Sequence, residues 1–441
     1  MITHTPSFDQ TVLEHHMQED KMVQRYRAFF SLIDFTPVHQ YQAERTPSDR
    51  PTHPEEAYIR AFLVKIIEGK AYMSQLRAFL IEHPLLVAEL GFRLHLDPTQ
   101  PHGFDVEKTV PKKRWLNAKL HTFSTILLQD LFARTVHALQ DAIPGLGETI
   151  AIDVKHIYAW VRENNPRESI KDRFDPTRQP KGDPDCKLGV KKSTNIEKED
   201  GSKKVEKEYL WGYGSGVAAA TIGGYGDVVL AEYTRRFNEG DITYYLPLYC
   251  QAVSNLGFFP KNVAADAAFD AWHVHQTCAF HGGIAAVPLN ERGHKDVRYD
   301  KDGVPICEKG LRMHPTIQFQ HTNGYRAQRF VCPLLYPHAT GETCDHEQFK
   351  KGKGCRKDPN WEAGGIMRVT LDRTSPLYKT IYRQRTCAER INSQAKELGI
   401  ERPKVRNIHS VTNLNTLTYI IINVRALQRA KSINEGLLPM S

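Results

Sequence analysis

The sequence predicts an α/β fold between residues 146 and 295, preceded by an all-helical region. Three apolar runs of strand length lie in this segment, namely TIAID at 149–153, NVAAD at 262–266 and IAAVPL at 284–289. Glycine-rich turns and stretches with helical spacing separate them. Such an alternation is typical of a sheet that is flanked by helices.

The composition is that of a globular protein that can contact nucleic acid. The 441 residues are 40% hydrophobic and 25% charged, with a formal net charge of +8. This length suffices for two or three domains, and the mild basicity permits nucleic-acid binding without requiring it. The longest apolar run, at 417–424, is too short to cross a membrane. No signal peptide is recognisable, so we expect a cytoplasmic chain whose eight cysteines are not a disulfide framework.

Residues 1–145 are predicted to form a helical domain. Acidic residues directly after Pro54 favour a helix start there, and Gly69 ends that helix. Short helices joined by tight turns fit a helix-turn-helix, and fit a small bundle that does not contact DNA equally well. The expected segments are helices at 10–33, 54–69, 75–82 (capped by Ser74), 85–90 and 112–141, with a linker at 94–111.

Residues 146–295 carry the predicted sheet. Residues 166–207 contain four prolines and many charges, and they predict a mobile loop. The other expected segments are a strand at 149–153 that can continue to 160, hairpin strands at 208–223 and 227–235, a helix at 241–256, a strand at 262–266, a helix at 267–280 and a strand at 284–289.

Residues 296–365 interrupt this pattern and carry four cysteines, Cys307, Cys332, Cys344 and Cys355. Thiolates can bind structural zinc, but the spacings are wide and contain no C-x-x-C pair, so scattered free thiols are the alternative. Further imidazole ligands are available from His321, His338 and His346. Residues 366–441 are expected to contain a strand at 367–371, a helix at 382–396 and an amphipathic helix at 409–430, capped near Ser410.

The predicted helix at 382–396, YRQRTCAERINSQAK, has an unusual polar face. At about 100° per residue, Tyr382, Arg385 and Lys396 all fall within about 60° of Glu389 or of one another. A carboxylate between two cations suits a surface that faces phosphates and a metal ion. A solvated face with an Arg385–Glu389 ion pair is the common alternative.

The spacing Tyr-x2-Arg-x3-Glu-x6-Lys resembles the YREK signature of a large group of bacterial insertion-sequence transposases. These are DDE transposases with an RNase H-like catalytic core, a mixed sheet flanked by helices. The resemblance implies a core in two parts, 146–295 and 366–441, around the cysteine-containing insertion at 296–365. Residues 53–80 also look like part of the domain that precedes such cores, so 1–145 would bind the DNA ends. Related transposases often carry a cysteine-bearing insertion at this place.

The resemblance further implies that Asp153, Asp266 and Glu389 form the catalytic triad. ADAAFDA at 265–271 is similar to the family stretch A-D-x-G-[YF]-D-S, whose first aspartate is catalytic, although Ala268 replaces the usual glycine. Asp266 is therefore preferred to Asp270. Taken singly, Asp153 could be a turn residue and Asp266 a helix cap.

Three carboxylates in one pocket stay ionised only beside divalent cations, and oxygen ligands favour two Mg²⁺ or Mn²⁺ ions. Arg385 and Lys396, with Tyr382 as a donor, would then bind DNA phosphates. A flipped base would need an aromatic platform, for which the candidates are Trp160, Trp211, Trp272 and Trp361; a buried core role is the alternative for each.

The predicted function is cut-and-paste transposition of the chain's own insertion sequence, by hydrolysis and strand transfer at terminal inverted repeats. The partners would be double-stranded DNA, at the element's ends and at the target, and a second copy of the chain that bridges two ends. Such a protein would act at the nucleoid in the cytoplasm of a prokaryote and would not bind a membrane. Two alternatives remain: an inactive or domesticated DNA-binding protein, and an endonuclease that cuts without joining.

Overall fold

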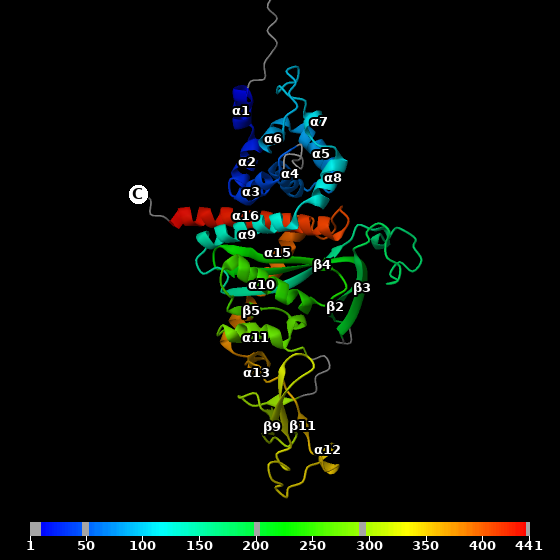
Figure 1. Ribbon diagram of the computed structural model, residues 1–441, viewed down its shortest axis with the longest axis vertical. Helices are drawn as coiled ribbons and strands as arrows, with labels where there is room; N and C mark the ends of the chain where they lie inside the picture. Colours follow the sequence, from blue (N-terminus) through cyan, green and yellow to red (C-terminus); the bar gives the residue numbers. More distant parts are fainter. Residues whose placement is uncertain (1–9, 46–52, 198–202, 291–296, 438–441) are drawn as a thin grey trace, which may run out of the picture. The chain divides into compact units, whose positions relative to one another are not determined.

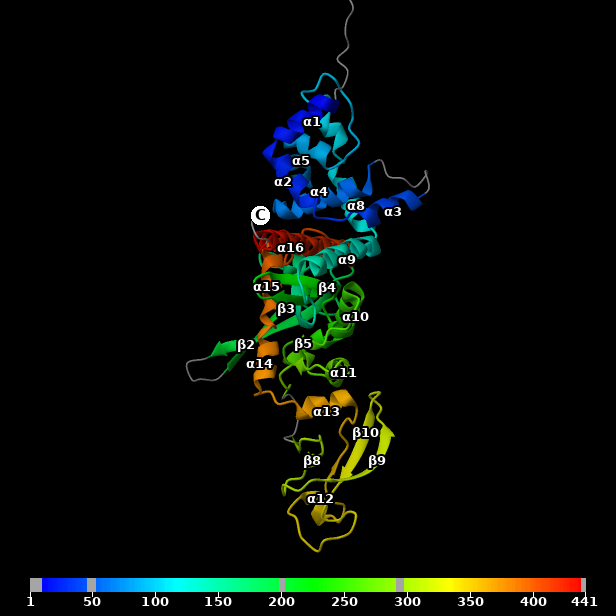
Figure 2. The same ribbon diagram turned by 90° about the vertical axis from the view of Figure 1, so that its left-hand side faces the viewer.

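The computed structural model describes residues 10–45, 53–197, 203–290 and 297–437. The chain forms two compact units. The first unit comprises Met1–Leu146, Val154–Glu239 and Ala388–Ser441, and the second comprises Gly147–Asp153 and Gly240–Cys387. Figures 1 and 2 show the elements of both units.

The N-terminal part of the first unit is helical, as predicted. Two of the expected helices are nevertheless divided. Asp20 caps a second helix within the first, because its carboxylate accepts from Val23 N at 2.8 Å. Ser124 caps a new helix within the predicted 112–141 segment. The cap expected at Ser74 is instead at Tyr72. The elements are α1 (Gln10–Glu19), α2 (Lys21–Phe30), α3 (Thr36–Glu44), α4 (Glu55–Ile67), α5 (Met73–Glu82), α6 (Pro84–Glu89), α7 (Val106–Thr109), α8 (Lys113–Thr122) and α9 (Thr125–Ala142).

The C-terminal helix α16 (Ile408–Leu437) is the central element of the first unit. It packs against α9 along its length and also contacts α4, α8 and β4, and both views show α16 and α9 side by side. Apolar side chains such as Leu417, Ile421 and Val424 are buried in it. Asn415 and Asn423, on other faces of the helix, are buried too. The helix is therefore enclosed on most sides, and not only along the single stripe that an amphipathic surface helix would bury.

The sheet of the first unit is an antiparallel ribbon. β3 (Lys203–Ile222) pairs with β2 (Lys187–Glu197) and with β4 (Gly226–Arg236). The hairpin of β3 and β4 confirms the sequence prediction. The predicted loop at 166–207 is wrong in its second half, where 187–197 form β2 and 203–207 form the start of β3. Backbone hydrogen bonds between the two strands, rather than apolar alternation, define this ribbon, so its charged composition concealed it.

The second unit contains a small parallel sheet. Strand β1 (Thr149–Tyr158) begins in this unit and pairs with β5 (Asn262–Ala264), which pairs with β6 (Ala285–Ala286). The second half of β1 belongs to the first unit and neighbours β3. The strand order is therefore β2-β3-β1-β5-β6. The α/β class is confirmed as a mixed sheet with helices. Those of the second unit's core are η3 (Asp241–Tyr244), α10 (Tyr245–Leu256), η4 (Ala267–Phe269), α11 (Trp272–Phe280) and α14 (Pro376–Arg383).

The predicted insertion at 296–365 contains mainly short strands. The segment that directly follows it differs from the prediction. The segment expected as a strand at 367–371 belongs to helix α13 (Ala363–Thr370), which packs on α11. Gly364 allows this approach, because a Cβ at this position would lie 2.4 Å from Gln276 N. The other elements are β7 (Arg298–Tyr299), β8 (Pro305–Ile306), β9 (His314–Gln320), β10 (Arg326–Val331), α12 (Glu347–Lys350) and β11 (Arg356–Lys357).

Among the residues that the structure describes, none of the helices has the length and apolar character needed to cross a membrane.

Glu232 on β4 makes the stability of the first unit depend on pH. Burial raises the pKa of Glu232 to about 7, and hydrogen bonds from Thr416 and Gln129 offset this only partly. Because the pKa of Glu232 is higher in the folded protein than the ordinary value of 4.5, protonation of Glu232 stabilises the folded state. This contribution to the unfolding free energy is complete below pH 4.5 and is lost as the pH rises through about 7. Glu232→Gln removes the charge, so this variant should be more stable than the wild type by about 3 kcal/mol at pH 8, with little difference at pH 4. Denaturant unfolding at both pH values measures this.

Glu397→Gln is the matched control for that experiment, because Glu397 is exposed at the end of α15 (Thr386–Glu397). Its effect should be small at both pH values. A Glu232→Gln protein whose stability relative to the wild type does not change between pH 4 and pH 8 would contradict the assignment.

Candidate active site

In the second unit, Asp153 lies on β1, and Asp266 lies two residues beyond the end of the neighbouring parallel strand β5. β1 and β5 are aligned so that Ala151 pairs with Ala264. Each aspartate follows two residues after one of these alanines, and residues two apart on a strand share a face of the sheet. The two carboxylates therefore occupy matched positions. The strand does not end at Asp153, however, because β1 continues to Tyr158.

Asp266 is also a helix cap, which is the ordinary role that its sequence position allows. Its Oδ1 atom accepts a hydrogen bond from Ala268 N at 2.8 Å, at the start of η4. A carboxylate offers about four lone-pair sites. The cap therefore occupies only one of the lone-pair sites of the Asp266 carboxylate, and the same carboxylate could also bind a cation.

A third carboxylate, Asp241, lies near these two. Burial, and then the negative charges of Asp266 and Asp153, raise the pKa of Asp241 to about 6. Asp241 begins η3, and η3 contacts η4, the short helix that Asp266 caps. The sequence analysis did not single out this residue, because an acidic residue at the start of a helix is ordinary. Negative charge is thus concentrated around Asp153 and Asp266.

Asp270, the second aspartate of ADAAFDA, holds the segment that follows Asp266. Its side chain is 0% exposed, and Arg368 binds it through Nε at 2.7 Å and Nη2 at 2.5 Å. Asn290 N donates to it at 2.8 Å, and His275 Nε2 lies 3.5 Å away. Burial alone would raise the pKa of Asp270, but the neighbouring His275 and the hydrogen bonds from Arg368 and Asn290 outweigh burial and hold this pKa well below its usual range. Asp270 is therefore a buried structural anion, as the preference for Asp266 requires.

The stretch at 382–396 is not one helix, contrary to the prediction. α14 ends at Arg383, and α15 (Thr386–Glu397) begins after a turn at Gln384–Arg385. Arg385 lies in this turn, where its guanidinium carbon is 5.6 Å from the centre of the Tyr382 ring. The angles calculated for a single helix therefore do not apply to Tyr382 and Arg385.

Glu389 and Lys396 do share α15, seven residues and about two turns apart, so they lie on one face of it. Lys396 Nζ is 3.2 Å from Glu401 and its side chain is 64% exposed. The adjacent Arg390 binds Asp227 on β4 through two contacts of 2.6 Å. Cys387, Ala388 and several later residues of α15 are buried on the opposite side, which leaves the Glu389 face exposed.

The structure therefore brings Asp153 and Asp266 together in the second unit, with Tyr382 and Arg385 in the same unit. Glu389 and Lys396 belong to the first unit. Within the described ranges, no three His, Cys, Asp or Glu side chains form a group that could hold a metal ion. The roles assigned to the triad and to the phosphate-binding residues stay predictions.

Three of the four insertion cysteines lie close together. Burial, and then the neighbouring thiols of Cys332 and Cys307, raise the pKa of Cys355 to about 12. Cys307 also packs in a small apolar cluster with Val304, and Cys344 is half-exposed. All four are free thiols. Structural zinc at these cysteines stays a prediction.

The tryptophans differ in exposure. Trp211 is buried and donates from Nε1 to Arg173 O at 2.8 Å, which supports a core role. Trp361 packs on Phe330, and Trp272 packs on Tyr325. Trp160 is 36% exposed. Of the four candidates, Trp160 is thus the one that offers most surface to a ligand.

Comparisons with known proteins do not establish a family. No family model matches the chain, and no curated protein matches it. One solved structure that matches is the cryo-EM structure of the piggyBac transposase synaptic complex with hairpin DNA, at a TM-score of 0.31 and 9% identity, covering 99% of this chain and 83% of that chain. A likeness at this TM-score carries no argument for fold or function.

Arg368 is expected to stabilise the second unit because it neutralises a buried charge. Arg368→Met leaves the Asp270 carboxylate without its guanidinium, which should cost about 3–5 kcal/mol of unfolding free energy. Denaturant unfolding at pH 7 measures this. The exposed Arg383→Met should change stability by less than about 0.5 kcal/mol. Asp270→Asn combined with Arg368→Met should recover part of the loss, and a double variant no more stable than Arg368→Met would contradict the charge explanation.

Proposed function

We propose that this chain is a DNA transposase that cuts and joins phosphodiester bonds with Asp153, Asp266 and Glu389. The observation that supports the proposal is the register of β1 and β5, which pairs Ala151 with Ala264, two residues before Asp153 and Asp266 respectively. The signature residues of α14, the following turn and α15 support it by their resemblance to YREK transposases. The proposed fold of the core is RNase H-like.

The carboxylates would hold Mg²⁺ or Mn²⁺, because hard oxygen donors suit these ions. When bound, two such ions would supply a nucleophilic water or 3′-hydroxyl and stabilise the leaving oxygen. Burial, and then the negative charges of Asp266 and Asp153, raise the pKa of Asp241. Such a crowding of carboxylates suits a site that binds cations. Because Asp153 and Asp266 extend from paired strands, their backbones would hold both carboxylates in fixed positions.

The cations of the signature would hold the DNA. Arg385 is steadied by its contact with the Tyr382 ring, and its planar group can bind one phosphate through two hydrogen bonds. Lys396 would leave its exposed pair with Glu401 at little cost, since such pairs are weak. In this proposal residues 1–145 recognise the terminal inverted repeats, and two copies of the chain bridge the two ends.

Two other functions would use the same site differently. An endonuclease would cut the DNA ends but would not join them to a target, and an inactive relative would bind DNA without cutting. A strand-transfer assay with the flanking DNA of the gene as substrate separates all three. Cleavage products without joined products would favour the endonuclease.

The carboxylate variants test the chemistry. Asp153→Asn, Asp266→Asn and Glu389→Gln should each abolish Mg²⁺- or Mn²⁺-dependent cleavage of inverted-repeat DNA, because each removes a charged metal ligand. DNA binding without divalent metal should persist. Glu397→Gln, an exposed carboxylate on the same helix as Glu389, is the control and should cleave normally. Normal cleavage by any of the three variants would remove that residue from the proposed triad.

Lys396 provides a separate test of the phosphate contacts. Each lost contact lowers the slope of log affinity against log salt concentration by about one. Lys396→Met should show this decrease, measured by fluorescence anisotropy on duplex DNA between low and moderate salt. Lys431→Met, on the exposed face of α16, should not. An unchanged slope for Lys396→Met would reject its contact with phosphate.

A further inference from the structure

Helices α10 and α11 of the second unit carry almost no charge. Residues 242–260 contain no Asp, Glu, Lys or Arg, and residues 267–289 contain one, Asp270. The Asp270 side chain is 0% exposed, so it adds no charge to the surface. Charged residues make up 25% of the whole chain. These two helices therefore depart clearly from the composition of an ordinary protein surface.

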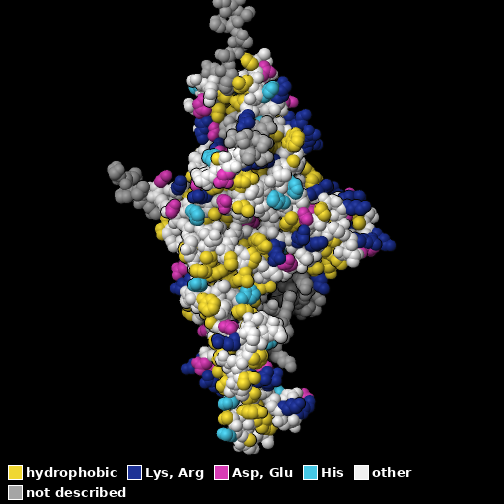
Figure 3. Space-filling view, viewed as in Figure 1, with side chains coloured by type: hydrophobic (Ala, Val, Ile, Leu, Met, Phe, Trp, Pro, Cys, Tyr) yellow, Lys and Arg dark blue, Asp and Glu magenta, His cyan; other side chains and the backbone are white. Residues whose placement is uncertain are grey.

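Large apolar side chains are exposed where these two helices end. Phe280 is the last residue of α11 and is 70% exposed. Phe259, in the turn that follows α10, is 55% exposed, and Phe258 is exposed beside it. We call these three residues the phenylalanine surface, and Figure 3 shows hydrophobic side chains over α10 and α11. Exposed aromatic side chains in a region depleted of charge are typical of the centre of a protein–protein interface.

The backbone around the phenylalanine surface is held firmly in place. Gly257 ends α10 with a φ of +74°, a conformation that glycine adopts without strain. The Phe259 ring stacks on the His281 ring, with centroids 4.3 Å apart. A Cβ at Gly283 would lie 1.9 Å from Lys261 O, so the turn after α11 packs directly on the chain beside Phe259. A surface that is already ordered loses little conformational entropy when it binds a partner.

One cation and one anion lie beside each other next to this surface. Lys261, two residues after Phe259, has its Nζ atom 3.7 Å from Glu148, and the two side chains are 49% and 67% exposed. Lys261 N also donates to Glu148 O at 2.9 Å, which ties the two backbones together. A two-fold axis sets identical surfaces against each other in opposite directions. Lys261 of one copy can therefore face Glu148 of another, so the surface complements itself in charge.

The charges of the chain also favour a second copy over DNA as the partner. DNA is bound through its phosphates by Lys and Arg side chains, and residues 242–260 and 267–289 contain neither. The whole chain has a formal net charge of +8, so two copies repel each other where their basic side chains meet. An uncharged surface is where such repulsion is weakest.

We infer that the phenylalanine surface binds the same surface of a second copy, in a two-fold dimer that forms without DNA. Phe258, Phe259 and Phe280 form its centre, and Lys261 and Glu148 pair across its edge. The inference rests on the proposed function only in expecting two copies of the chain. It adds the surface at which they meet.

Sedimentation velocity of the full chain at several concentrations, without DNA and without divalent metal, tests this. The wild type should show a monomer–dimer equilibrium. Phe280→Asp should raise the dissociation constant by at least about tenfold, because it removes a central aromatic side chain and would bury an unpaired charge. Ile126→Asp is the matched control, since Ile126 is 76% exposed on α9 of the first unit. It should leave the dissociation constant unchanged.

Exchanged charges test the edge of the dimer. Lys261→Glu leaves two anions there, and Glu148→Lys leaves two cations, so each variant alone should dimerise more weakly than the wild type. A mixture of the two variants should form a heterodimer, because the acidic edge of one then meets the basic edge of the other. A Lys261–Glu148 pair that acts only within one copy predicts no gain on mixing.

A wild type that stays monomeric at every concentration would overturn the inference, as would a dimer that Phe280→Asp does not weaken or a mixture that forms no heterodimer. A dimer that appears only when inverted-repeat DNA is added would also overturn it, since the DNA would then join the copies. Because no cleavage is measured, failure of the proposed transposase activity would not affect these results. Melting temperatures of all variants show whether a loss of dimer reflects a loss of fold.

Discussion

The first unit depends on polar side chains of α16 that are buried against β4. Asn423 donates to Val229 O and accepts from Val229 N, both at 2.8 Å. Asn415 donates to the Thr234 hydroxyl at 2.8 Å, and Thr416 donates to Glu232 at 2.6 Å. Among the described strands, β4 pairs only with β3. Asn423 therefore satisfies backbone groups of β4, and Asn415 and Thr416 bind side chains of the same strand. Together these contacts fix the register of the helix on the strand more strictly than apolar packing would.

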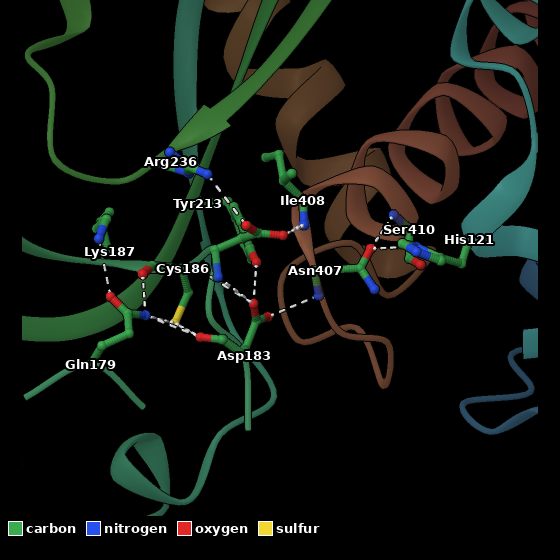
Figure 4. Close-up of polar contacts among 11 residues, drawn as sticks. His121, Gln179, Asp183, Cys186, Lys187, Tyr213, Arg236, Asn407, Ile408 and Ser410 are labelled. Carbon is green, nitrogen blue, oxygen red and sulfur yellow. Dashed lines mark hydrogen bonds and ion pairs between the residues drawn. The ribbon is translucent and has the colours of Figure 1, made fainter. Parts of the chain in front are cut away.

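This constraint extends to the segment before α16. The helix can begin at Ile408 only because Asn407 adopts a left-handed conformation and caps it, and Asp183 and Asp185 hold the two backbone N–H groups at that point (Figure 4). Residues 402–406 are consequently a fixed connection between α15 and α16. The same connection bears Arg402, Lys404 and Arg406, which line a pocket of the first unit. The position of these charges therefore follows from how the central helix begins.

The sequence predicted what local pattern determines, and missed what tertiary contacts decide. The apolar runs that end near Asp153 and Asp266 were recognisable because strands that are buried on both faces have nearly continuous apolar sequences. The break between α14 and α15 was not, since nothing in YRQRTCAERINSQAK opposes a continuous helix. Residues 367–371 have the composition of a strand, but Gly364 lets α13 approach α11 closely and override that preference. Asp241 and the 402–406 segment carry no periodic signal, and only the fold gives them neighbours.

Two parts of the structure concentrate charge of one sign, which lowers stability unless a ligand compensates it. Around Asp241 the charge is negative, and the pKa of that group is raised as a result of burial and of its neighbours. Around Arg402, Lys404 and Arg406 it is positive. Asp270 shows that the chain can neutralise a buried charge where it needs only stability, because Arg368 binds it directly. The first region would be compensated by cations and the second by phosphates. The proposed function would use both regions, because metal-dependent chemistry on DNA requires cations and phosphates.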